Sequence, residues 1–150
     1  MTRFGTCLLF AVSLLVVFGI TACGSNSSRQ LESIAISPSG NFSILQYTAT
    51  GTFNKSPTNV TPLPVSWYLV NTAVNPAING PVYGYSLTTQ PFAISTCAPT
   101  DTVVALAPAD PNAPTSGALT GQVYQDLVVA HTVSKEEGFV AEAVTVNCTL

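Results

Sequence analysis

Few side chains in this sequence could carry out chemistry, and His131 comes first because it is the only histidine. As a general base it would need a nucleophilic serine and an orienting acid. No GxSxG turn or other nucleophile signature accompanies it. It lies in an alternating apolar run at residues 127–133, which favours a partly buried strand histidine over a catalytic one. The acids that could partner it are Asp101, Asp110 and Asp126.

Paired carboxylates would indicate glycoside hydrolysis, and a loop of oxygen ligands would indicate calcium. Glu136 and Glu137 are adjacent in a turn-like SKEEG segment, so they are not a pair held across a cleft. The segment Asp110-Pro111-Asn112 offers two oxygen ligands but lacks the acidic run and the glycine of an EF-hand. The sequence therefore predicts no catalytic residue, no metal and no other cofactor, with calcium at residues 110–112 as the alternative left open.

The composition limits the class of partner. Only 7% of the 150 residues are charged, and the formal net charge is −3, whereas about a quarter of the residues of a soluble domain are usually charged. A chain with four basic residues lacks the positive surface that phosphate backbones require. We therefore expect no nucleic acid partner.

The N-terminal segment has the outline of a signal peptide. Arg3 precedes an apolar run at residues 7–20, CLLFAVSLLVVFGI, and small and polar residues follow. This run is about 14 residues long, shorter than the roughly 20 residues that a membrane-spanning helix needs. The pattern therefore favours a targeting signal over a permanent anchor helix.

The end of this segment, Ile20-Thr21-Ala22-Cys23 followed by Gly24, resembles the bacterial lipoprotein signal. That signal has an aliphatic residue, two small residues and then the cysteine that is lipidated. The resemblance implies removal of residues 1–22, acylation of Cys23, and stable anchoring by several acyl chains. Residues 23–30 would then be the lipidated cysteine and a flexible tether, and residues 31–150 the folded domain. An ordinary secretory signal with a chance cysteine is the alternative.

The four cysteines divide according to this interpretation. Cys7 is removed with the signal and Cys23 takes the lipid, which leaves Cys97 and Cys148 as one pair in an exported protein. Export implies an oxidising compartment, so we expect a structural disulfide between them. Two free thiols are the alternative, but no CxxC spacing indicates redox catalysis or zinc binding.

From Leu31 onward the hydrophobic residues alternate over short runs that proline, glycine and asparagine separate. Eleven prolines in this chain argue against a helical domain. The pattern predicts an all-β fold, an antiparallel β-sandwich, with Trp67 as its central core aromatic. Turns are expected at SPSG, NKSPTN, NPAINGP, PADPNAPTSG and SKEEG, and strands at residues 32–37, 45–53, 64–70, 84–87, 92–96, 102–107, 123–133 and 139–147.

Three segments resemble the first half of a bacterial immunoglobulin-like domain of the group 2 family. They are LESIAISP at residues 31–38, YTATGTF at residues 47–53, and Val60-Thr61 leading to VSW at residues 65–67. The second half departs from the family in having a longer segment before the closing strand. The resemblance implies an immunoglobulin-like sandwich used at bacterial surfaces for adhesion, spacing or carbohydrate contact, and it implies no catalytic residues.

Aromatic side chains beside the expected loops could stack on sugar rings, or could be core and edge packing. The sequence favours packing, because most tyrosines at such positions bury the ring and extend the hydroxyl to water. These residues are Tyr68, Tyr83, Tyr85, Phe92 and Tyr124.

The sequence thus predicts a non-enzymatic, lipid-anchored protein of the cell envelope with an adhesion, binding or structural role. Its expected partners are the membrane, through the lipid anchor, and a carbohydrate or an envelope protein. Gly24 after the lipidated cysteine is, by resemblance to sorting rules, compatible with the outer membrane, on either face. Two alternatives remain: a small carbohydrate-active or hydrolytic lipoprotein that uses His131, and a subunit of an envelope assembly that accepts a partner strand at a sheet edge.

Overall fold

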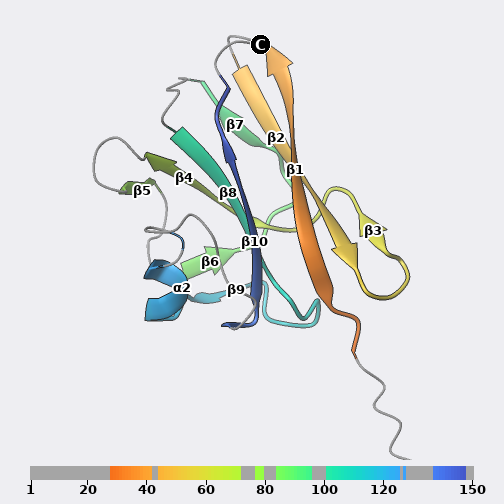
Figure 1. Cartoon of the computed structure of the whole chain (residues 1–150). Coiled ribbons are helices and arrows are strands. Elements are labelled where there is room, and N and C mark those ends of the chain that lie inside the picture. Colours follow the sequence, from red (N-terminus) through yellow and green to blue (C-terminus); the bar gives the residue numbers. More distant parts are fainter. Residues whose placement is uncertain are drawn as a thin grey trace, which may run out of the picture.

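The computed structural model describes residues 28–41, 44–71, 77–79, 84–95, 101–125, 127 and 137–147. These residues form two antiparallel four-stranded sheets, a two-stranded sheet and one short helix (Figure 1). Within the same residues, no helix is long and apolar enough to cross a membrane.

The first sheet contains β1 (Leu31–Asn41), β2 (Ile44–Phe53), β3 (Asn59–Val60) and β7 (Phe92–Ile94). The pairing of β2 with each of the other three strands is antiparallel. Burial alternates along β2, with Tyr47, Ala49, Gly51 and Phe53 buried and the threonines between them facing outward. The alternation predicted for this strand is therefore confirmed.

Strand β1 is longer than predicted, because it continues through the expected SPSG turn at residues 37–40. Pro38 is tolerated there because β1 is an edge strand, where a missing N–H costs no ladder hydrogen bond on the open side. Gly40 has a φ of 110°, which explains why glycine is used at this position. Near the start of β1, a register shift between Leu31 and Ser33 leaves Glu32 unpaired and keeps Leu31 and Ile34 both buried.

The second sheet has the order β10-β8-β4-β5, formed by β4 (Ser66–Asn71), β5 (Ala77–Asn79), β8 (Asp101–Pro108) and β10 (Phe139–Thr145). Every pair in it is antiparallel. Hydrophobic clusters that combine residues of both sheets lie between the two sheets, as in a β-sandwich. The all-β, antiparallel sandwich predicted from the sequence is confirmed.

The core between the two sheets contains buried residues from both, for example Ile34 and Phe53 of the first sheet and Ala105 of the second. Trp67 packs against both hydrophobic clusters between the sheets, but it is only half-buried, so it is not the enclosed central aromatic that was predicted. Its ring stacks on Phe92, with ring centroids 5.8 Å apart. A residue as large as tryptophan is rarely enclosed completely, and smaller side chains fill the centre.

A third layer, here called the cover layer, lies on the outer face of the second sheet (Figure 1). It consists of β6 (Gly84–Ser86), β9 (Ser116–Ala118) and the helix α2 (Gly121–Gln125). Strands β6 and β9 pair antiparallel with each other. Side chains of this layer pack against the outward residues of β4 and β8, so all eight residues of β8 are buried.

The helix α2 corrects the strand predicted at residues 123–133. Residues 121–125 are helical, and Val123 and Leu127, which are four residues apart, are both fully buried. Thr120 caps the helix, because its Oγ1 accepts a hydrogen bond from the Val123 N–H at 3.3 Å. Apart from Leu127, the rest of the predicted strand lies outside the described residues.

Candidate functional site

Several residues singled out in the sequence lie outside the described residues, so the structure does not test their predicted roles. They are Cys23 with the whole signal segment, Cys97, Cys148, His131, Asp126, Glu136 and Tyr83.

Two of the described carboxylates considered as partners of His131, Asp101 and Asp110, lie far from each other. Asp101 and Asp110 flank the two ends of β8, an eight-residue strand that spans roughly 25 Å. Two glycosidase carboxyl groups lie within about 10 Å of each other, so these two do not form such a pair. Among the described residues, no group of three or more His, Cys, Asp and Glu side chains could hold a metal ion.

The segment considered for calcium, Asp110 to Asn112, forms a local turn. Asp110 Oδ1 accepts hydrogen bonds from the Asn112 backbone N–H at 2.9 Å and from its Nδ2 at 3.2 Å. The Ala113 N–H donates to the carbonyl of Asp110 at 3.0 Å and closes the turn. This arrangement is an Asx turn, in which the carboxylate stabilises its own loop.

Two of the tyrosines considered for sugar stacking, Tyr68 and Tyr85, pack inside the protein. Tyr68 is 1% exposed and its hydroxyl donates to the carbonyl of Gly84 at 2.8 Å. Tyr85 is also buried, and its hydroxyl donates to the carbonyl of Pro114 at 3.0 Å. Burial raises the pKa of the Tyr68 hydroxyl. Packing, the interpretation that the sequence favoured, is therefore correct for these two rings.

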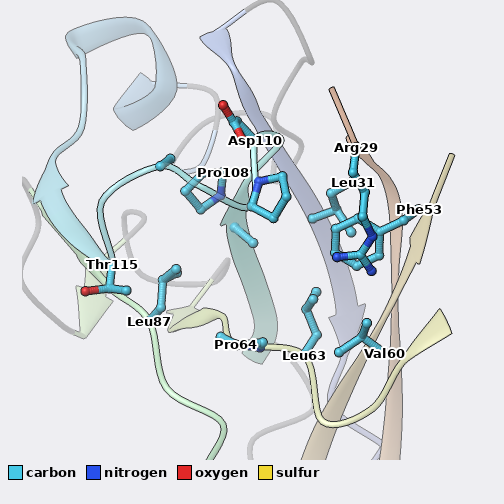
Figure 2. A pocket seen from close by; sticks show the side chains of 13 residues that line it. Arg29, Leu31, Phe53, Val60, Leu63, Pro64, Leu87, Pro108, Asp110 and Thr115 are labelled. Atoms are coloured by element: carbon cyan, nitrogen blue, oxygen red, sulfur yellow. The ribbon is translucent and has the colours of Figure 1, made fainter. Parts of the chain in front are cut away.

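A pocket of about 240 Å³ opens at the end of the sandwich where β1 begins (Figure 2). It lies between the start of the first sheet and the loop that follows β8, and nearly all of its walls are hydrophobic. The hydrogen bond from the Leu31 N–H to the carbonyl of Ala109, at 2.8 Å, joins these two sides. The pocket is lined by Arg29, Leu31, Phe53, Val60, Leu63, Pro64, Leu87, Ala107, Pro108, Asp110, Pro111, Ala113 and Thr115.

Arg29 is the cation of this pocket, and three contacts hold its guanidinium. Its central carbon lies 3.6 Å from the centroid of the Phe53 ring, a cation–π contact. Its Nε donates to the carbonyl of Lys55 at 3.3 Å, and Nη2 donates to the carbonyl of Pro57 at 2.6 Å. The loop after β2 therefore fixes the charge at the rim of the pocket.

The neighbouring residue Gln30 joins the chain to the same loop. Its N–H donates to Asn54 Oδ1 at 2.8 Å, and the Asn54 N–H donates to the carbonyl of Gln30 at 3.1 Å. Arg29 and Gln30, which the sequence assigned to the tether, are thus part of the hydrogen-bonded structure.

Sequence reasoning did not identify this site. Arg29 and Phe53 are 24 positions apart, and only the pairing of β1 with β2 brings them together. The scarcity of charge was the one available signal, because Arg29 is one of only four basic residues in the chain. The described residues that line the pocket place apolar side chains beside the fixed positive charge of Arg29, an arrangement that can bind an apolar group carrying an anion. No protein-family model, curated protein or solved structure matches this chain.

Proposed function

We propose that this chain is a lipid-anchored, non-enzymatic protein of the bacterial cell envelope, with a β-sandwich that serves a binding, adhesion or structural role. In this proposal residues 1–22 are the signal peptide that is removed, and Cys23 carries the lipid. The resemblance of the signal and of residues 31–74 to the families named above supports the proposal.

The observation that carries the proposal is the short sequence distance between Cys23 and Arg29, a residue that the sandwich holds in place. Arg29 is already held by the loop after β2 and lies only six residues after Cys23. Six residues span at most about 20 Å. A lipid on Cys23 would therefore hold the pocket end of the sandwich close to the membrane and leave the opposite end free for contacts.

The proposed Cys97–Cys148 disulfide has support from the residues beside it. Ile94 and Val146 pack in one hydrophobic cluster. Cys97 follows Ile94 by three residues, and Cys148 follows Val146 by two. Both cysteines are thus attached, by short lengths of chain, to neighbouring points at the end of the sandwich opposite the pocket.

The intact mass of the protein extracted from its native membrane, before and after reduction, tests both features. The expected mass begins at Cys23 and includes the acyl chains. Two thiols should become available to alkylation only after reduction. The Cys23→Ser variant is the control for the lipid, because it should lose the acyl mass.

Different results would reject different parts of the proposal. A mass that retains residues 1–22, or a mature form without lipid, rejects the anchor. Two thiols that react without reduction reject the disulfide and leave the anchor standing.

A further inference from the structure

We propose that the pocket beside Arg29 binds a carboxylate that carries an apolar group about as large as one aromatic ring. This inference deepens the binding role proposed above, and it does not depend on the lipid at Cys23. Its two parts, the size of the apolar group and the sign of the charge, come from separate observations.

The volume sets the size of the apolar group. The pocket measures about 240 Å³. An apolar cavity of about 150 Å³ is large enough to bind benzene, whereas sites for drug-sized ligands begin near 300 Å³. The pocket therefore accommodates one ring or a branched aliphatic group with a short linker, and it is too small for a long acyl chain.

The walls set the polarity of that group. Leu31, Phe53, Leu63 and Ala107 line the pocket and are each no more than 6% exposed. Figure 2 shows the leucines and prolines around the opening, with Arg29 over Phe53 on one side. Transfer of an apolar group from water into these surroundings is favourable.

Arg29 sets the charge. A guanidinium has five N–H donors, and the carbonyls of Lys55 and Pro57 use two of them. In the part of the chain that the structure describes, the remaining three have no acceptor. Because Phe53 and the two carbonyls already hold the guanidinium in place, binding a carboxylate would immobilise little more of this side chain.

The acid in the lining does not reverse this preference. Asp110 Oδ1 accepts two hydrogen bonds from Asn112, within its own turn. Figure 2 shows the Asp110 side chain directed away from Arg29. The fixed charge next to the apolar walls is therefore positive, and a carboxylate is favoured over an amine.

The test is a titration of the folded protein with 3-phenylpropionate, followed by backbone amide shifts in NMR spectra. The neutral 3-phenylpropionamide and the cationic phenethylamine are the matched probes. We expect saturable shifts at the pocket residues with the carboxylate, and much weaker binding of the amide and of the amine. Absence of saturable shifts with the carboxylate at millimolar concentration, or equal binding of the amide, would overturn the proposal.

Two variants and their controls assign the binding to this pocket. Arg29→Gln should weaken binding about tenfold or more, whereas Glu142→Gln removes a charge at an exposed position of β10 outside the lining and should change it little. Ala113→Phe fills the pocket from a partly exposed loop position and should abolish binding. Its control, Ala93→Phe, adds the same ring at an exposed position on β7. Unchanged binding in both Arg29→Gln and Ala113→Phe would overturn the proposal even if the protein binds the probe.

The source of the carboxylate is resolved by two further probes, N-acetyl-phenylalanine and a tripeptide that ends in phenylalanine. Equal or tighter binding of the tripeptide supports the C-terminal residue of a partner polypeptide as the ligand. Loss of binding on adding the two residues supports a free small acid. Failure of every carboxylate probe, with the lipidated mass intact, rejects the pocket and leaves the proposed anchor unaffected.

Discussion

The two large sheets of the sandwich differ in how they meet water. The first sheet buries one face and exposes the other, so β2 alternates between buried residues and outward threonines such as Thr50. In the second sheet, the cover layer packs on the outer side of β4 and β8, so the central strand β8 is covered on both faces. All eight residues of β8 are consequently buried.

This difference shows how a sandwich of modest size can enlarge its core. In an antiparallel sheet with one solvated face, the sequence of each strand alternates between apolar and polar residues. In a strand that is covered on both faces, the sequence is a continuous apolar run. The run TVVALA at residues 102–107 is of the second kind. The cover layer gives the protein a second hydrophobic cluster, which includes Tyr68, Val104 and Leu106 and lies on the far side of β4 and β8 from the inter-sheet core.

The largest expected effect comes from truncating Leu106, which points outward from β8 into the cover layer. Leu106→Ala should lower the free energy of unfolding by about 2–5 kcal/mol, because it leaves a cavity among residues that cannot collapse fully. Urea unfolding measures the loss. In a two-layer sandwich this position would face water and the same change would cost little.

Leu45→Ala, in the core between the sheets, is the matched variant for this comparison. The two truncations should cost similar amounts if the outer cluster is packed as well as the inner one. If Leu106→Ala lowers the free energy of unfolding by less than about 1 kcal/mol while Leu45→Ala lowers it by more, the packing of the cover layer on β8 is contradicted.

A second expected effect concerns Gly51, the one glycine on the buried face of β2. A Cβ at this position would lie 2.7 Å from a methyl of Leu63 and 2.9 Å from one of Leu31. Gly51→Val should therefore destabilise the fold by about 1–3 kcal/mol through overpacking, although valine is the better strand former. Thr50→Val is the control, because it introduces valine at the adjacent outward position. Equal melting temperatures for Gly51→Val and the unmodified protein would show that this face is not closely packed.

A third, smaller effect depends on pH. Burial raises the pKa of the Tyr68 hydroxyl above its ordinary value of 10.0, and a hydrogen bond with the Ser66 side chain opposes this shift. The folded protein then holds the proton more tightly than the unfolded chain does. The contribution to stability is complete below about pH 10 and is lost as the pH rises through the folded pKa. Burial raises the pKa of Tyr47 in the same direction.

Tyr68→Phe tests this assignment. At pH 7 it should cost about 1 kcal/mol, because the hydrogen bond to the Gly84 carbonyl is lost. Above pH 10 the variant should lose stability less steeply than the unmodified protein, with Tyr47 accounting for the remainder. If the curves of unfolding free energy against pH are parallel for Tyr68→Phe and the unmodified protein, the raised pKa of the buried Tyr68 hydroxyl is contradicted.

The sequence predicted three of the four strands in each large sheet, but it missed the helix of the cover layer and the pocket, for physical reasons. Alternation is visible in β2 because water and core lie on opposite faces, and that prediction was correct. The continuous run of β8 predicted a strand but carried no information about what covers it, and the helix at residues 121–125 was mistaken for part of a strand. Strands β3, β5 and β9 have two or three residues each, too few to show a period. The contact of Arg29 with Phe53 depends on the register between two strands, which no local pattern encodes.

The smallest effect is expected on the solvated face of the first sheet. Thr50 and Thr61 are joined there by a hydrogen bond of 2.6 Å between their hydroxyls. Because water can replace this bond at an exposed position, Thr50→Ala should change the free energy of unfolding by no more than about 0.5 kcal/mol. The Thr50→Ala/Thr61→Ala double variant should be additive to within a similar amount. Urea unfolding of the two single variants and the double variant measures both quantities. A loss as large as that of Leu106→Ala would mean that this face is covered in solution, by a second copy or by a partner, and that the contrast between the two sheets holds only for the isolated chain.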